Sequence, residues 1–322
     1  MSPDGRNPSQ EDDNDEPEIT GTPVITEADS DIPETKPETD GFPALLGSPA
    51  ASNPNTINAP FGALYNLTDD VFIYGKDIDR RVYPSGAAKL LTALTVCDVI
   101  ELDFVFQVGE EIGMISLGSG VAGLARGQEL DLISMLTALL IPIGNDAAYT
   151  ISVNTARSLS ESDNLSNSEL NRYFLSLMNQ YARKLGAENS NFSNPDGFHA
   201  SDNYSTVRDL ALIAAASAKN PLISTICGKP EHEVTFKSGE TYVWSNSNNF
   251  LNIANRDIRG LRTGYTDESG FSAQILARID GKDYIVVVSG SETSAARERD
   301  VLRLLDLVTD GIDADVISVY DG

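Results

Sequence analysis

Gly86 and Lys89 form the part of the sequence whose residue types and spacing bear most directly on chemistry. A serine hydroxyl attacks a carbonyl when a base lies within hydrogen-bond reach, and burial lowers the pKa of a lysine amine until it can act as that base. Residues three apart share one face of a helix, so a serine three positions before Lys89 would lie beside the amine. Glycine occupies that position, so the spacing predicts a base without its nucleophile.

Ser85 lies four residues before Lys89 and offers an alternative nucleophile. Proximity on a helix is compatible with this spacing, but a shift of one residue turns a side chain by about 100° around the helix axis. Pro84 comes before Ser85 and a helical pattern follows it, which favours Ser85 as the residue that caps the helix. We therefore expect a cap, with nucleophilic attack by Ser85 as the alternative.

Three segments in order resemble those of the penicillin-binding serine peptidases. Residues 83–94 resemble the Ser-x-x-Lys segment of that family, and residues 139–148 resemble the Ser-Gly-Asn segment of its D-alanyl-D-alanine carboxypeptidases. Residues 260–270 are similar to the family's Lys-Thr-Gly strand. The resemblance covers about residues 60–310. It implies an α+β fold of the penicillin-binding protein and β-lactamase type, in which an antiparallel sheet formed from both ends encloses a helical subdomain.

The resemblance implies a role for each matching position. Lys89 keeps the base position, Gly86 takes the place of the nucleophile, and Ile143 takes the place of a second serine. The implied substrate-binding residues are Asn145, which would contact the substrate's amide, and Arg262, Thr263 and Gly264, which would hold its terminal carboxylate. Arginine replaces the family's lysine at 262, and a guanidinium can bind a carboxylate through two hydrogen bonds.

This pattern of loss and retention predicts a catalytically impaired homologue. Both hydroxyl positions are lost, whereas the residues that hold a ligand remain, so we expect binding of peptidoglycan stem peptides or a partner without cleavage. The alternatives are an active serine carboxypeptidase that uses Ser85, and a structural domain with no ligand. Restoring serine at 86 and 143 would be expected to restore acylation.

His199 and His232 lie near no cluster of metal-ligand spacing and are expected at the surface, so we predict neither metal nor cofactor.

Composition divides the chain in two. Residues 1–55 hold 13 acidic and 2 basic residues and 9 of the 15 prolines, which predicts a disordered acidic spacer. Residues 56–322 form the peptidase-like domain. The net charge of −25 argues against nucleic acid as a partner. Within the domain, hairpins are expected near residues 64–74, 234–244 and 271–289, and helices in between.

The sequence contains no apolar run of about 18 residues, so we expect no membrane-spanning segment. Its N-terminus lacks the basic and apolar regions of a signal peptide. Two expectations fit this: a cytoplasmic protein, or a chain that begins after a removed export signal. The family resemblance implies an extracytoplasmic location at the cell envelope.

Overall fold

The structure is a computed structural model that describes residues 56–236 and 239–309. The acidic spacer predicted for residues 1–55 lies outside the described residues, as do residues 310–322.

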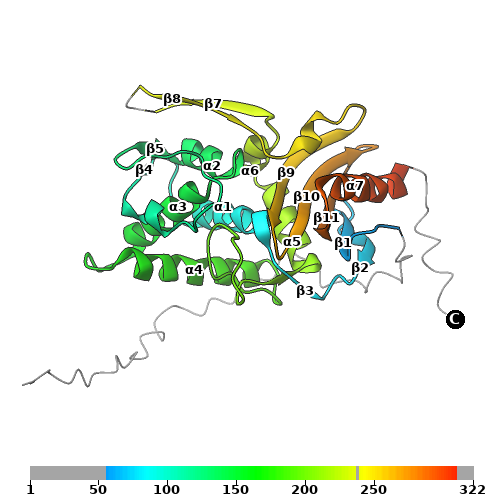
Figure 1. Cartoon of the computed structure of the whole chain (residues 1–322), viewed down its shortest axis with the longest axis horizontal. Helices are drawn as coiled ribbons and strands as arrows, with labels where there is room; N and C mark the ends of the chain where they lie inside the picture. Colours follow the sequence, from blue (N-terminus) through cyan, green and yellow to red (C-terminus); the bar gives the residue numbers. More distant parts are fainter. Residues whose placement is uncertain (1–55, 237–238, 310–322) are drawn as a thin grey trace, which may run out of the picture. The chain divides into compact units, whose positions relative to one another are not determined.

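A five-stranded antiparallel sheet, in the order β2-β1-β11-β10-β9, joins the two ends of the described chain, as the sequence predicted (Figure 1). Its strands are β1 (Phe61–Asn66), β2 (Val71–Lys76), β9 (Asp257–Thr266), β10 (Gly270–Ile279) and β11 (Lys282–Ser291). Three two-stranded sheets complete the strands: β3 (Arg81–Val82) with β6 (Ser205–Thr206), β4 (Val105–Gln107) with β5 (Glu129–Asp131), and β7 (Glu231–Thr235) with β8 (Thr241–Ser245).

The turn between β10 and β11 sets the register of these two strands up to a shift between Phe271 and Ala273. Asp280 and Gly281 both have positive φ, 48° and 80°, as a two-residue primed turn requires. The right-handed twist of such a turn matches that of the strands, and the register continues along the ladder with Ile275 opposite Val286. The hairpin predicted from Asp-Gly between two β-rich runs is confirmed.

Helices cover both faces of this sheet (Figure 1). On one face of the sheet, Val286 and Val288 of β11 share a hydrophobic cluster with Leu304 of α7 (Ser294–Thr309). The alternate residues Ile285 and Val287 belong to the hydrophobic cluster on the other face. This alternation follows from the two-residue period of a strand. The helices are α1 (Ala88–Val99), α2 (Leu132–Leu140), α3 (Asn145–Leu159), α4 (Asn167–Lys184), α5 (Val207–Lys219), α6 (Pro221–Cys227) and α7 (Ser294–Thr309), with short 3-10 turns η1 (Ser85–Ala87), η2 (Glu110–Met114) and η3 (Asn249–Asn252).

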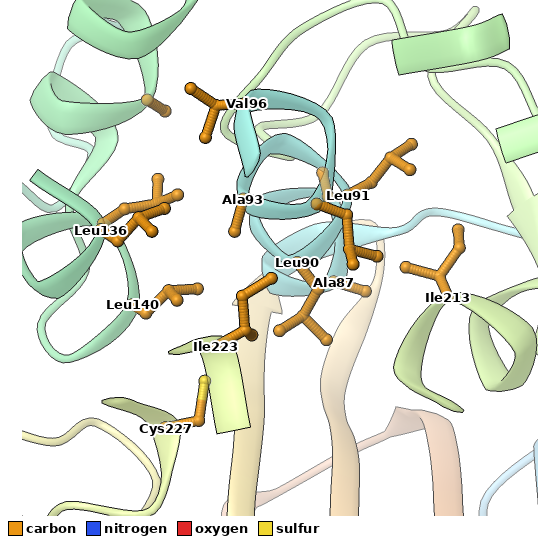
Figure 2. Close-up of a cluster of buried hydrophobic side chains, with 14 of the residues drawn as sticks. Ala87, Leu90, Leu91, Ala93, Val96, Leu136, Leu140, Ile213, Ile223 and Cys227 are labelled. Atoms are coloured by element: carbon orange, nitrogen blue, oxygen red, sulfur yellow. The ribbon is translucent and has the colours of Figure 1, made fainter. Parts of the chain in front are cut away.

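Helix α1 runs through the centre of the helical part (Figure 2). Residues 88–96 are buried on every side of the helix, against α2, α5 and α6 among others. A helix that is apolar all round belongs in a core, so Lys89 is an exceptional residue within it.

Of the helices in the described ranges, none alone is long and apolar enough to cross a membrane; α5 and α6 reach that length and composition only as a pair bent by 98°.

The start of α1 packs directly on β9, the edge strand of the sheet, through two glycines. A Cβ built on Gly86 would lie 2.6 Å from the Thr263 carbonyl oxygen, and a Cβ built on Gly264 would lie 2.5 Å from the Gly86 nitrogen. Real Cβ atoms do not approach other atoms so closely. The two chain segments reach this separation because neither glycine has a side chain at the contact.

Ser85 does not cap the helix, so that prediction is wrong. The residue before η1 is Pro84, and no side chain caps the turn. Ser85 itself has φ +48°, a left-handed conformation that costs a non-glycine residue free energy and is typical of functional sites. Gly197 packs directly against this residue, because a Cβ at Gly197 would lie 1.8 Å from the Ser85 carbonyl oxygen.

Gly86→Ser should destabilise the fold. The added side chain must push β9 away from η1, and overpacking of this kind costs about 1–3 kcal/mol. Gly113→Ser is the matched control, because a Cβ there meets nothing within 4 Å and its change should stay within about 0.5 kcal/mol. Urea unfolding of the three proteins measures both values. Equal stability of the two variants would contradict the close packing of η1 on β9.

Candidate functional site

All eight residues singled out in the sequence line one cavity of about 540 Å³. Strand β9 forms one wall, η1 and the first turn of α1 form another, and the loops at 117–120, 143–145 and 196–199 close the rest. The lining residues predicted from the sequence are Ser85, Gly86, Lys89, Ile143, Asn145, Arg262, Thr263 and Gly264. Segments far apart in the chain therefore meet where the motifs placed them.

Lys89 is buried, with 3% of its surface exposed. Its Nζ donates a hydrogen bond to the main-chain oxygen of Asp196. Burial lowers the pKa of Lys89 from 10.5 to about 8, although the charge of Asp196 acts in the opposite direction. An amine with this pKa is partly neutral near neutral pH, which suits a base. The Lys89 ammonium group donates to Asp196, and no hydrogen bond joins Lys89 to Ser85 within the described ranges.

Arg262 is almost completely buried in the wall of the cavity. Its guanidinium is 1% exposed and donates to the carbonyl oxygens of Leu140 and Pro142. Burial lowers its pKa from 12.5 to about 10. The neighbouring Thr263 hydroxyl donates to the Ser247 carbonyl oxygen at 3.0 Å. Arg262 thus connects β9 to the end of α2 through these hydrogen bonds. It also lines the cavity, so its positive charge lies in the cavity wall.

Asp146 fixes the wall that carries Asn145 and Ile143. Its carboxylate accepts hydrogen bonds from the main-chain nitrogens of residues 122, 123 and 124, each at 2.8 Å. This holds the 117–124 loop against the start of α3, and Trp244 supports the loop by donating to the Ala122 carbonyl oxygen at 2.9 Å. Asn145 is buried, with its Oδ1 unpaired among the described residues, while Ile143 is 52% exposed at the mouth.

Two further residues of the cavity were missed. His199 was expected at the surface, but its ring lines the cavity, stacks edge-on against Tyr83 and places Nδ1 3.8 Å from the Glu268 carboxylate. Arg297 of α7 reaches the same cavity, 6% exposed, with its guanidinium over the Phe250 ring. Neither belongs to a motif; the only sequence signal was the position of His199 directly after the Asn-Pro-Asp-Gly-Phe segment at 194–198.

The arrangement offers a base, buried positive charge and hydrogen-bonding groups, but glycine where the hydroxyl would be. The part of the chain that the structure describes contains no group of three His, Cys, Asp or Glu side chains able to hold a metal ion. Lys89 and Asn145 line the cavity together with Gly86, so the cavity combines a candidate base with a position that carries no side chain.

Lys89→Met tests whether the lysine pKa is lowered in the folded protein. Between a folded pKa of about 8 and the ordinary value of 10.5, the unfolded chain binds more protons than the folded one. Stability of the wild type relative to the variant should therefore rise with pH in this window, by up to about 1 kcal/mol per pH unit. Urea unfolding at about pH 7.5, 8.5 and 9.5 measures the difference. A difference independent of pH would contradict the lowered pKa.

Comparisons with known proteins identify the family of this chain. A family model described as D-alanyl-D-alanine carboxypeptidase, peptidase S11, matches residues 49–293. The D-alanyl-D-alanine carboxypeptidase DacF of Bacillus subtilis is 26% identical over 237 residues, which is 73% of this chain and 58% of that relative. The chain thus spans about three fifths of the length of this relative.

The fold is shared with solved structures of the same kind. The DD-transpeptidase of Streptomyces K15 superposes with a TM-score of 0.72 at 25% identity, over 79% of this chain and 98% of that one. Penicillin-binding protein 6B of Escherichia coli gives a TM-score of 0.67 at 23% identity, over 82% and 80% of the two chains. With a family model matching most of its length, the chain belongs to the D-alanyl-D-alanine carboxypeptidase family.

Proposed function

We propose that this member of a peptidoglycan-related family binds carboxylate-ended stem peptides without cleaving them. The observation that carries the proposal is the contact at Gly86. The residue has no hydroxyl, and the Thr263 carbonyl oxygen lies 2.6 Å from where its Cβ would be. The space that a nucleophilic side chain would need is therefore occupied by the main chain of β9. By analogy with the family, whose members act on the cell wall, the protein would work at the cell envelope.

Ser85 is poorly arranged to replace the lost nucleophile. Its Oγ faces β9, since a Cβ on Gly264 would lie 2.5 Å from it. The nearest candidate base, Lys89, donates to Asp196 instead. Attack by Ser85 would require the Ser85 hydroxyl and the Lys89 amine to leave these positions. Binding without cleavage is therefore favoured over an active enzyme that uses Ser85.

The cavity retains features that suit a polar ligand. Buried polar atoms are normally hydrogen-bonded, so a concentration of unpaired ones needs a reason. Among the described residues, six such side-chain atoms belong to residues that line this one cavity: Asn145 Oδ1, Asp196 Oδ2, His199 Nδ1, Ser247 Oγ, Arg262 Nε and Arg297 Nε. A cavity of about 540 Å³ is within the range that accepts small ligands. These atoms are available to a ligand that brings its own donors and acceptors.

Three buried cations make an anionic ligand end the best match. Lys89, Arg262 and Arg297 line the cavity with no more than 6% exposed surface, against one buried carboxylate, Asp196. Their partners within the described ranges are carbonyl and hydroxyl oxygens, which satisfy donors but do not neutralise charge. A terminal carboxylate would supply the missing negative charge.

A labelled β-lactam tests for catalysis. Intact mass of the wild type after incubation should show no covalent adduct, because acylation needs a hydroxyl in reach of a base. Contrary to the expectation from sequence, Gly86→Ser with Ile143→Ser should also stay unmodified, since β9 occupies the space at residue 86. A stoichiometric adduct on Ser85 would establish the active-enzyme alternative and refute the proposal.

Titration with diacetyl-L-Lys-D-Ala-D-Ala tests for binding. Calorimetry or NMR should detect an affinity in the micromolar to millimolar range. The same peptide ending in a carboxamide should bind about tenfold more weakly, because it lacks the anion that the cations attract. No binding of the acid at millimolar concentration would support a structural domain without a ligand.

A further inference from the structure

Three large apolar side chains stand exposed around the mouth of the cavity. Leu117 is fully exposed, and Ile143 and Tyr265 are 52% and 53% exposed. Single exposed apolar residues are ordinary on protein surfaces. These three are not scattered, because all of them line the same cavity. We call them the apolar rim.

The wall that carries two of the rim residues is held in place. A Cβ on Gly120 would lie 2.6 Å from Cγ2 of Ile143, so the loop that contains Leu117 packs directly against Ile143. The three main-chain hydrogen bonds to Asp146 anchor the continuation of this loop. Leu117 and Ile143 therefore lie on neighbouring segments that pack together through Gly120, with the Leu117 side chain fully exposed.

Tyr265 is fixed on the other wall. Its ring lies against Phe271 with 4.4 Å between centroids, and its hydroxyl donates to Asp267 at 2.7 Å. Because the side chain is held from both ends, it keeps its exposed surface at the mouth instead of collapsing onto β9. A preorganised apolar surface of this kind binds a ligand at little cost in conformational entropy.

Charge sets the orientation of an occupant. The inner part of the cavity holds the three buried cations, whereas Asp267 and Glu268 are exposed at the mouth. An occupant with one anionic end would place that end inward, and the part of it that follows would pass the apolar rim. A second copy of this chain fits less well, because two acidic mouths would face each other.

We infer that the apolar rim is a specificity surface for an apolar group carried by the peptide, upstream of the two residues that end in the carboxylate. This inference rests on the proposed function and adds the chemical class of the ligand. The replacement of serine by isoleucine at 143 then has two effects: it removes a hydroxyl, and it supplies one of the three residues of the apolar rim.

Two peptides that differ only at the N-terminus test the inference. Acetyl-L-Ala-D-Ala-D-Ala and 3-phenylpropanoyl-L-Ala-D-Ala-D-Ala share the terminal carboxylate, and only the second carries a large apolar group. The second should bind the wild type about tenfold more tightly, as expected for partial burial of an aromatic ring. The gain should fall below about threefold in Leu117→Ser/Ile143→Ser.

Ile133→Ser is the matched control. Ile133 is 50% exposed, nearly the same as Ile143, but it does not line the cavity, so the full gain should remain. Circular dichroism and thermal unfolding establish that each variant is folded. Sedimentation over a concentration series detects self-association through the apolar rim.

The outcomes separate this inference from the proposed function. Equal binding of both peptides, a gain that survives in the double variant, or self-association lost in that variant would overturn the apolar rim as a ligand surface and leave peptide binding in place. If only the 3-phenylpropanoyl peptide binds, and its binding is lost in the double variant, the apolar rim would be supported as a ligand surface. The acetyl peptide would then be excluded as a ligand. Failure of both peptides to bind at millimolar concentration would overturn both proposals.

Discussion

The close approach of η1 to β9 is the constraint on which the site depends. Two glycines, Gly86 and Gly264, allow main chain to lie against main chain where a side chain would otherwise separate them. The approach fixes the edge strand of the sheet to the start of α1, and so sets the position of Lys89 one turn further on. The same contact, at the position that the resemblance assigns to a nucleophile, also holds the two walls of the cavity together.

The architecture around the cavity does not depend on a reactive group at residue 86. Asp146 still anchors the 117–124 loop through three main-chain hydrogen bonds, and Trp244 supports that loop from the β7–β8 hairpin. Neither residue has a group placed to react. They stabilise the walls of the cavity, which a purely structural domain would not need to keep open. Such retention is easier to understand if the cavity continues to hold a ligand.

Much of the fold was predictable because local signals agreed with it. Asp280-Gly281 specified a tight turn, whereas the capping box of Ser166 and Glu169, which begins the helix at 167–184, is a local signal that the sequence prediction did not use. The site residues were found through motif resemblance, which predicts proximity but not orientation. Ser85 packs against Gly197, more than a hundred residues away, and the carbonyl partners of Arg262 lie at and just after the end of α2. Contacts of this range leave no local pattern in sequence.

The buried cations give the strongest physical reason to regard the cavity as a place of binding. Removing a charged group from water costs free energy, and the lowered pKa values of Lys89, Arg262 and Arg297 all have burial as their main cause. Carbonyl partners offset only part of this cost, because they do not carry a full charge. A chain with a net charge of −25 has abundant acidic residues, yet Asp196 is the single carboxylate buried among the cavity's lining residues. The excess of positive over negative buried charge is therefore concentrated where an anionic ligand end would offset it.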